Sequence, residues 1–545
     1  MKEFTDLQWL IGKLTSIEKK ILLKFINISN EKASDTQSLV LIRKMMQGND
    51  CNESNVQKLI YGKINTSAFR KLIKRLYEKV LDVILLKQSF DNNPHFDKRI
   101  NEIFLLRKKL LQFDLLISRG YSDSIWSQLD KIIKQAYKYE YFDILLLALY
   151  KKRRVQATIL KQNDFKKLTL EIFKVERNRS FLNHAEESFH LNCTGKVKHI
   201  SKIDERRASI QDSMKLMQNN ISTSKVSGIQ YYLFLHQMEY YDLCSDYYSS
   251  LQTSRNLVNF LERTNSVSST TRLLTAKINL ANINMKCYYF SEAFSTLHNL
   301  DRRVFRNETD DILVKEILLQ YYIFSCNSLK ANDCLVYLEP MTNMKAKYVS
   351  FYPKYLYYST TVNYLFDNKK TNGNLPFYEL SSNLPEDKWK FSQRVFQIQL
   401  LIESEKFEQA DFQIENNRKF VERLKKSEVL NARQALISKI LVELSRKSYD
   451  FKKVWKSRRK ELDLLDSVDP DYRWQIMSPE LVVFHEWFQA QLNHEKYDHG
   501  KVMAKMKAKI SPVVQKPLLT LPADGGSKHN RRVSARVKGE KLASA

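Results

Sequence analysis

Apolar residues recur at helical spacing along most of this chain. The stretch TSAFRKLIKRLYEKVLDVILL predicts a helix that begins near Thr66, because its apolar residues share one face: Phe69, Leu72, Ile73, Leu76, Tyr77, Val80, Leu81 and Ile84. Upstream, LTSIEKKILLKFINI carries a capping box, Thr15 with Glu18, ahead of an apolar run. From about residue 98 to 510 one helical pattern follows another. The pattern therefore predicts an all-α protein.

Breaks in the pattern divide the chain into three parts. Ser89–Asp97, SFDNNPHFD, interrupts the helical period, so residues 1–95 are predicted to form a small helical head. Residues 96–510 are predicted to form a helical repeat region. Two stretches inside it read as irregular: Arg177–His199 and Asp367–Lys388. Residues 511–545 hold three of the ten prolines and three of the eleven glycines, and we expect them to be a disordered basic tail.

Glycine and proline are scarce. The chain has 11 Gly and 10 Pro in 545 residues, where average usage gives roughly 38 and 27. Hairpins and phosphate-binding loops need these residues for positive φ and fixed turns. The sequence also has no GxGxxG, GxxxxGK[ST], HExxH or GxSxG motif. We therefore predict a non-enzymatic protein that needs no cofactor. An enzyme whose site is built from scattered helix residues is an alternative.

The sequence does not predict a membrane span or a signal peptide. No run of about 18 apolar residues predicts a membrane span, and the N-terminal stretch does not read as a signal peptide. The six cysteines are scattered without a CxxC pair, which favours a reducing, cytoplasmic location.

A short aromatic and small-residue pattern recurs in the repeat region. In CYYFSEAFSTLHNL, Phe290 precedes Ala293 by three residues and Leu297 follows, after Leu280 and Ala281 upstream. An aromatic residue covers the end of a helical hairpin, and a small residue one turn later lets the two helices cross closely. Three further pairs share this spacing: Tyr121 with Ser124, Tyr241 with Cys244, and Phe407 with Ala410. Successive copies lie near multiples of about 40 residues, as expected for stacked hairpins.

On these residues the chain resembles tetratricopeptide-type helical-repeat proteins. The order of the head and the stretch that follows it also resembles an uncharacterised bacterial family with degenerate repeats. The resemblance implies a right-handed α-α solenoid of helical hairpins and a protein partner held in its concave groove. A non-repeating helical array is the alternative.

A net charge of +28 leaves a second function open. The protein could be a nucleic-acid-binding regulator, with a helix-turn-helix in the head and a mobile tail. The candidate polyanion-binding residues are Arg70, Lys71, Lys74 and Arg75 in the head, and Lys528, Arg531, Arg532 and Arg536 in the tail. A basic but merely solvated surface explains the same composition.

One cluster contains residue types that bind zinc: His184, Glu187, His190, Cys193 and His199. Its spacing matches no standard zinc site, so no metal is predicted.

Overall fold

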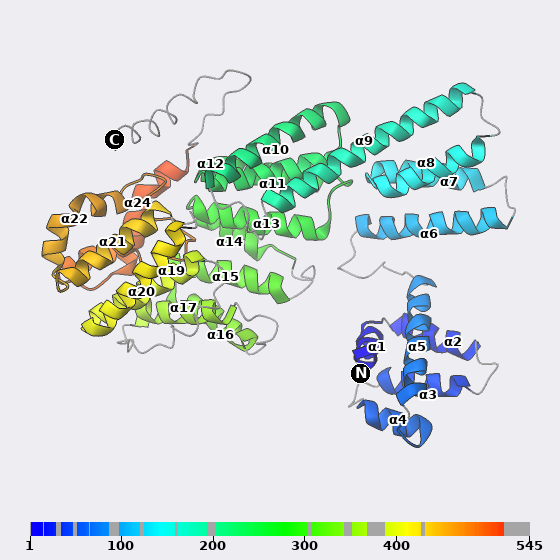
Figure 1. Ribbon diagram of the computed structural model, residues 1–545, viewed down its shortest axis with the longest axis horizontal. Coiled ribbons are helices and arrows are strands. Elements are labelled where there is room, and N and C mark those ends of the chain that lie inside the picture. The colour runs from blue at the N-terminus through cyan, green and yellow to red at the C-terminus, as the bar shows by residue number, and fades with distance from the viewer. Residues whose placement is uncertain are drawn as a thin grey trace. The chain divides into compact units, whose positions relative to one another are not determined.

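The computed structural model describes residues 2–14, 16–28, 34–46, 52–64, 66–86, 98–119, 125–157, 162–192, 203–301, 308–342, 351–367, 387–426 and 431–516. Within these ranges every regular element is a helix, and no strand occurs (Figure 1). The predicted all-α class is therefore confirmed. No described helix combines the length and apolar composition needed to cross a membrane.

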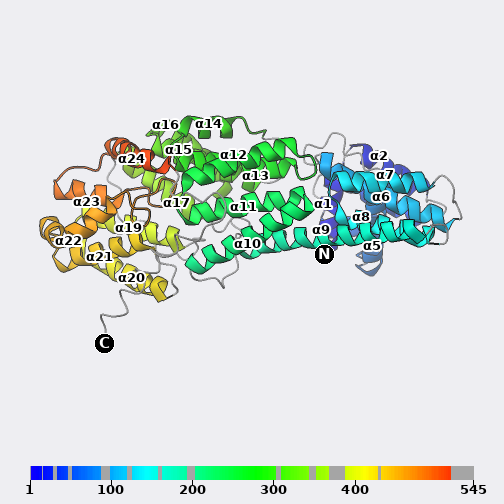
Figure 2. The same cartoon turned by 90° about the horizontal axis from the view of Figure 1, so that it is seen from above.

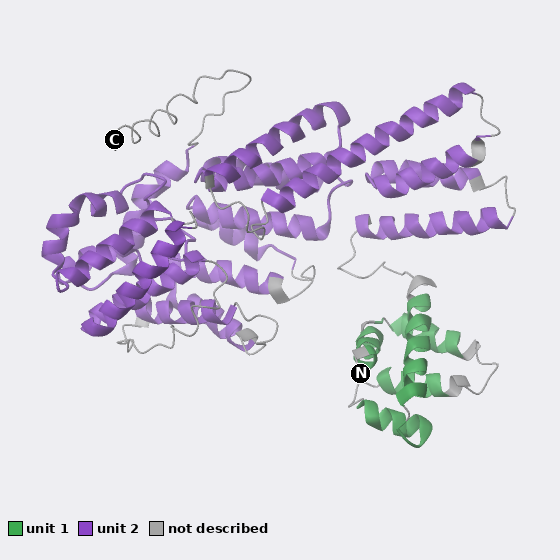
Figure 3. Cartoon of the chain, viewed as in Figure 1, with its two compact units in different colours: residues 1–93 green, residues 94–545 purple. Residues whose placement is uncertain are grey.

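The chain divides into two compact units, residues 1–93 and 94–545 (Figure 3). Unit 1 contains α1 (Lys2–Lys13), α2 (Ser16–Ile28), α3 (Ser34–Met46), α4 (Glu53–Tyr61) and α5 (Thr66–Leu86). Helix α5 supplies the largest share of the core of this unit, and its Phe69, Leu72 and Leu76 are fully buried where it packs against α1 and α2. Thr15, the predicted cap, lies outside the described residues.

Unit 2 contains the other described helices, and consecutive helices pack against each other for most of the described length. They are α6 (Lys98–Ser118), α7 (Ile125–Lys138), α8 (Phe142–Gln156), α9 (Gln162–Asn192), α10 (Ile203–Ser224), α11 (Ser227–Leu243), α12 (Tyr247–Arg263), α13 (Thr270–Lys286), α14 (Phe290–His298), α15 (Glu308–Phe324), α16 (Ser328–Thr342), α17 (Phe351–Val362), the π-helix η2 (Asn363–Asp367), α19 (Asp387–Glu403), α20 (Phe407–Lys426), α21 (Ala432–Arg446), α22 (Phe451–Leu465), α23 (Phe484–Leu492) and α24 (His499–Val514).

The same type of tight turn joins the two helices of five pairs among the described helices of unit 2. In each case a non-glycine residue with positive φ lies two positions before the next helix: Glu140, Ser245, Tyr288, Cys326 and Glu405. The N–H of the residue that follows donates to the carbonyl oxygen five positions earlier, at 2.9 Å every time. This is the Schellman arrangement that closes the C-terminus of a helix. The pairs it joins are α7–α8, α11–α12, α13–α14, α15–α16 and α19–α20, and the turn explains how so few glycines suffice.

The residue three positions into the second helix of each pair is fully buried. These residues are Leu145, Ser250, Ala293, Ala331 and Ala410. Most are small, as a close approach of two helices requires. Ser250 and Ala293 lie 43 residues apart, and Ala293 and Ala331 lie 38 apart.

The stretch Arg177–His199, predicted to be irregular, is helical up to Asn192. It forms the second half of α9, a helix of 31 residues. This helix reaches from α8 at one end to α10 and α11 at the other (Figures 1 and 2). Because neighbours contact it on more than one side, its apolar residues form no single stripe, and the sequence pattern was misleading. Similarly, α24 continues past the predicted boundary at residue 511 to Val514.

Side chains from the C-terminal part of unit 2 bond to the tight turns of earlier helix pairs. Arg473 Nη2 donates to the carbonyl oxygen of Ser245, His499 Nε2 to that of Ile323, and Gln515 Nε2 to that of Cys287, each at 2.9 Å. These carbonyls lie at the turns α11–α12, α15–α16 and α13–α14, where the last carbonyls of a helix lack partners within it. The C-terminal residues therefore complete three helix ends.

Candidate functional site

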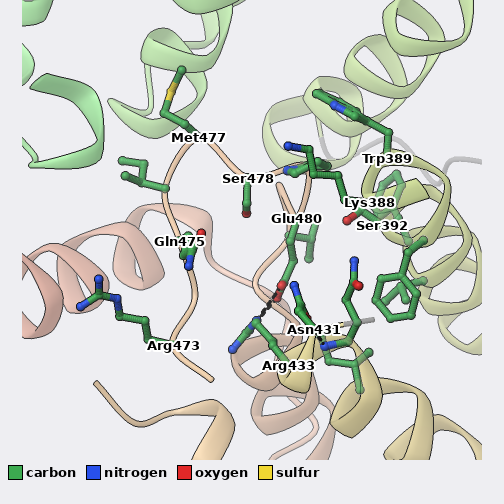
Figure 4. Close-up of a pocket in the computed structure, with 18 of the residues that line it drawn as sticks. Lys388, Trp389, Ser392, Asn431, Arg433, Arg473, Gln475, Met477, Ser478 and Glu480 are labelled. Atoms are coloured by element: carbon green, nitrogen blue, oxygen red, sulfur yellow. Dashed lines mark hydrogen bonds and ion pairs between the residues drawn. The ribbon is translucent and has the colours of Figure 1, made fainter. Parts of the chain in front are cut away.

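A cavity of about 240 Å³ opens in unit 2 between α19, α21 and the irregular segment 471–482 (Figure 4). We call it the first cavity. Residues from the ends of α11, α12 and α13 and from α17 complete its wall. The site thus gathers residues from Asp242 to Val482, which lie far apart in the chain.

Arg433 fastens the irregular segment to α21. Its Nε and Nη2 pair with the two carboxylate oxygens of Glu480, both at 2.7 Å. Its Nη1 donates to the carbonyl oxygens of Leu465 at 2.9 Å and Tyr472 at 2.7 Å. A bidentate pair with further bonds to carbonyls compensates the cost of burying both charges. Arg433 is therefore a structural group, and its donors are occupied.

Arg473, by contrast, is a buried cation with unused donors. It is 1% exposed, and its Nε and Nη1 have no hydrogen-bond partner among the described residues. Its Cζ lies 5.6 Å from the ring centre of Tyr247. Burial lowers the pKa of this guanidinium, although arginine stays charged in proteins. Its guanidinium points away from the Arg433–Glu480 pair (Figure 4).

The first cavity also has an aromatic wall and unpaired polar atoms. Trp389 lies on α19, and the Lys354 ammonium sits 4.5 Å from its ring centre. Gln399 lines the cavity on the same helix, and its Nε2 is buried without a hydrogen-bond partner among the described residues. Ser478 Oγ is in the same condition. Unpaired buried polar atoms cost about 1–3 kcal/mol each, so a ligand with matching groups would stabilise this wall.

A second cavity, also about 240 Å³, adjoins the first. Asp242 and Lys286 line both cavities. Its floor is apolar and comes from α9, α11 and α13: Phe189, Leu235, Met238 and Ile283. We call the two cavities together the two-cavity groove.

Asp242 and Lys286 form the boundary between the two cavities. The Lys286 ammonium bonds to the Asp242 carboxylate and lies 5.2 Å from the ring centre of Tyr247. Burial works to lower the pKa of Lys286, but Asp242 and the surrounding groups outweigh it and the net direction is upward. Lys286 is therefore a fixed cation in the middle of the groove.

Asn279 and Asn282 line the second cavity from α13. Both are partly exposed, and neither side chain forms a hydrogen bond within the described structure. With Lys286 they occupy positions i, i+3 and i+7 of one helix, so all three share a face.

The predicted repeat residues fall at helix ends and crossings. Phe290 and Phe407 are the first residues of α14 and α20, and Ala293 and Ala410 lie one turn further on. Leu297 and Ala281 are buried in the same core, and Leu280 packs against it. Tyr121 and Ser124 lie outside the described residues.

The register predicted for Tyr241 and Cys244 is wrong. Tyr241 lies in the last turn of α11, and Cys244 is the C-cap of that helix rather than part of the next. The residues in the equivalent places are Tyr247 and Ser250 of α12. Two aromatic and small-residue pairs occur in EYYDLCSDYYSS, and the turn at Ser245 selects the second.

The basic residues proposed for polyanion binding are placed only in the head. Arg70, Lys71, Lys74 and Arg75 are all exposed on α5. Helix α5 follows α4 after a short link in which Gly62 has a φ of 72°. Lys528, Arg531, Arg532 and Arg536 lie outside the described residues, as do Cys193 and His199 of the zinc-like cluster.

Asp466, His485 and Glu486 form a cluster with metal-ligand atoms. His485 Nδ1 accepts from Arg433 at 3.2 Å, so its Nε2 carries the proton and points to the carboxylates of Asp466, at 3.3 Å, and Glu486, at 3.5 Å. Lys509 already lies 2.7 Å from Asp466. A metal would need that Nε2 unprotonated, and we assign an ion-pair network.

Ser188 and His236 form a second polar cluster that resembles a nucleophile and its base. Ser188 Oγ lies 3.1 Å from His236 Nε2, and His236 Nδ1 bonds to the carbonyl oxygen of Tyr232 at 2.8 Å. Burial lowers the pKa of His236. The imidazole is fully buried, so it could not return a proton to a leaving group, as a serine hydrolase requires. We assign this cluster to the packing of α9, α10 and α11.

Comparison with models of known protein families, with curated proteins and with solved structures finds no match for this chain. The two-cavity groove is not among the sites that the sequence predicted. Segment 471–482 has no periodic pattern, and its partners lie far away in sequence, from Arg433, 47 residues before Glu480, to Ser245, 228 residues before Arg473. Only the abundance of amides and aromatics could have marked these residues.

Proposed function

We propose that this protein is a non-enzymatic scaffold that binds a segment of a partner protein in the two-cavity groove. The observation that carries the proposal is that two cavities adjoin at one fixed ion pair, Asp242 with Lys286. Each volume of about 240 Å³ matches about eight waters at roughly 30 Å³ each, which suits side chains of a linear segment and not a folded domain.

The finer architecture is part of the same proposal. The recurring tight turn and the buried residue three positions after it support a solenoid of helical hairpins. A right-handed superhelix of such hairpins would place α11, α13, α19 and α21 along one inner face. The four cysteines in the described ranges are unpaired, which supports a cytoplasmic location.

The test is selection of short linear peptides from a random display library on the full-length protein. Enriched peptides should lose binding to Lys388→Glu, which reverses a charge at the first cavity. They should keep binding to Lys425→Glu, the same change on an exposed site of α20. A selection that enriches no peptide, or peptides that bind both variants equally, would overturn the proposal.

A second function is favoured by one observation only. Four basic side chains, Arg70, Lys71, Lys74 and Arg75, are exposed within six residues of α5. They would let unit 1 bind the phosphate backbone of a nucleic acid. The salt titration described in the Discussion separates this function from the scaffold.

A further inference from the structure

We infer that the two-cavity groove recognises the main chain of an extended peptide, with apolar side chains of that peptide in the cavities. This inference rests on the proposed function and specifies the conformation of the ligand. It starts from Asn279 and Asn282, the partly exposed amides whose side chains have no hydrogen bond within the described structure.

A carboxamide offers both donors and acceptors. One peptide unit offers a single N–H and a single C=O, so the amide of Asn279 or Asn282 can pair with both. A peptide that covers these side chains removes their water, and each unpaired group would then cost free energy. The ligand must therefore carry donors and acceptors at short, regular spacing, as a main chain does.

This requirement decides between two modes of peptide binding. The main-chain groups of a helix bond to each other and are not offered to a partner. Those of an extended segment stay unpaired, so only the extended form matches both amides. Gln399 supports the same conclusion in the first cavity, because its Nε2 is buried and unpaired.

The walls of the groove define the ligand side chains. The floor of the second cavity contains Phe189, Met238 and Ile283, which suits an apolar side chain. The first cavity offers Trp389, Tyr357 and Phe396, which suits an apolar or aromatic one. Alternate side chains of an extended chain point the same way, at about 6.6 Å intervals. An extended peptide can thus fill both cavities while its main chain passes over the Asp242–Lys286 pair.

The charges of the groove give the ligand no net preference. Four cations and four carboxylates line the two cavities: Lys286, Lys388, Arg433 and Arg473 against Glu239, Asp242, Asp471 and Glu480. The groove therefore differs from a site for a polyanion, where cations would outnumber carboxylates.

The experiment uses a fluorescein-labelled synthetic copy of each peptide enriched by the display selection. Fluorescence anisotropy with the full-length protein gives its Kd. The double variant Asn279→Ala/Asn282→Ala should raise Kd about 10- to 100-fold for every peptide, whatever its sequence. Asn219→Ala removes an exposed amide of α10 outside the groove and should leave Kd unchanged. Alanine favours a helix more than asparagine, so the double variant should fold, as circular dichroism can check.

A second arm changes the ligand instead. N-methylation of a single central main-chain amide removes one donor without altering any side chain, and should weaken binding to a similar degree. Peptides that respond to Lys388→Glu but not to the double asparagine variant would overturn this inference and leave the proposed function standing. So would a peptide that becomes helical on binding. A selection that enriches no peptide would overturn both.

Discussion

The Nη2 of Arg473 donates a hydrogen bond to the carbonyl oxygen of Ser245, 2.9 Å away and 228 residues earlier in the chain. The bond closes the C-terminus of α11 and holds the segment that walls the first cavity. The other guanidinium nitrogens of Arg473 are buried and unpaired. Arg433 differs from Arg473 in this respect, because its donors bond to Glu480 and to two carbonyl oxygens.

This contrast gives the first prediction. Arg473→Met should change the free energy of unfolding by less than about 1 kcal/mol, because the loss of one bond is offset by removal of a desolvated cation. Arg433→Met should cost about 3–5 kcal/mol, because it leaves the Glu480 carboxylate buried without its partner. Chemical denaturation of both variants measures the difference. Equal losses would show that Arg473 has an anionic partner.

The second prediction concerns pH. Burial lowers the pKa of His499 from 6.5 to about 4, because the enclosed site disfavours the charged imidazolium, and the hydrogen bond to the Ile323 carbonyl offsets only part of this effect. Between these values the unfolded chain binds a proton that the folded one does not. The contribution of His499 is therefore complete above pH 6.5 and is lost as the pH falls toward 4, by about 1.4 kcal/mol per unit.

His499→Gln isolates this effect. A glutamine Nε2 can still donate to the Ile323 carbonyl but does not titrate. Thermal denaturation of both proteins at a series of pH values gives Tm as a function of pH. Below pH 6.5, Tm should fall more steeply for the unmodified protein than for His499→Gln. Parallel curves between pH 7 and pH 4 would mean that His499 titrates normally.

The third prediction tests the register of the helix pairs. Ala293→Leu should cost about 1–3 kcal/mol of stability, because the fully buried alanine has no room for a larger side chain. Glu292→Leu, at the exposed neighbouring position, should have little effect. At the α11–α12 pair the sensitive position should be Ser250 of α12 and not Cys244, the C-cap of α11. The reverse order at those two sites would restore the register that the sequence predicted.

The fourth prediction concerns the tight turns. Glu405 is exposed and has a φ of 57°, a conformation that costs a non-glycine residue free energy. Glu405→Gly should be neutral or stabilise the protein by up to about 1 kcal/mol, since the gain is partly offset by the freedom of glycine in the unfolded chain. Glu405→Val should destabilise it, because a β-branched residue resists positive φ. A destabilising glycine variant would show that the carboxylate itself supports the turn.

The fifth prediction separates the scaffold from the nucleic-acid function. We expect weak binding to a mixed DNA and RNA pool, with a shallow salt dependence that neither Lys71→Glu/Lys74→Glu/Arg75→Glu nor deletion of residues 523–545 alters. Each phosphate contact would contribute about 0.7–0.9 to the slope of log K against log salt. Tight, steep binding that either change flattens would favour the nucleic-acid regulator.

Features of this fold that depend on residues close together in sequence can be predicted, whereas features that depend on tertiary contacts cannot. The helix over α5 and the start of α14 at Phe290 follow from spacing within one or two turns, and the sequence predicts both. The spacing places Cys244 in the wrong helix because a serine, and not a glycine, adopts positive φ at the turn, so the sequence carries no glycine to mark it. The second half of α9 shows no helical pattern in the sequence because the helix contacts neighbours on several sides.

The candidate site was less predictable than the fold. Lys286 and Lys388 lie about 100 residues apart in sequence and meet only in the folded protein. Local patterns cannot indicate such a meeting, and the chemistry of Asn279 or Gln399 becomes distinctive only when their lack of partners is seen.

Arg473, His499 and Gln515 bond to carbonyl groups that lie between 176 and 228 residues earlier in the chain, and this separation has a consequence for synthesis on the ribosome. Ser245 is translated 228 residues before the arginine that caps its carbonyl, a delay on the order of 10 to 50 seconds at about 5–20 residues per second. During that interval the ends of α11, α13 and α15 stay hydrated, and the hydrophobic surface that the later helices cover is open to chaperones. The native state of this unit is therefore reached only after α24 has been made, and a nascent chain halted before residue 473 is a folding intermediate whose helix ends at α11, α13 and α15 lack these bonds.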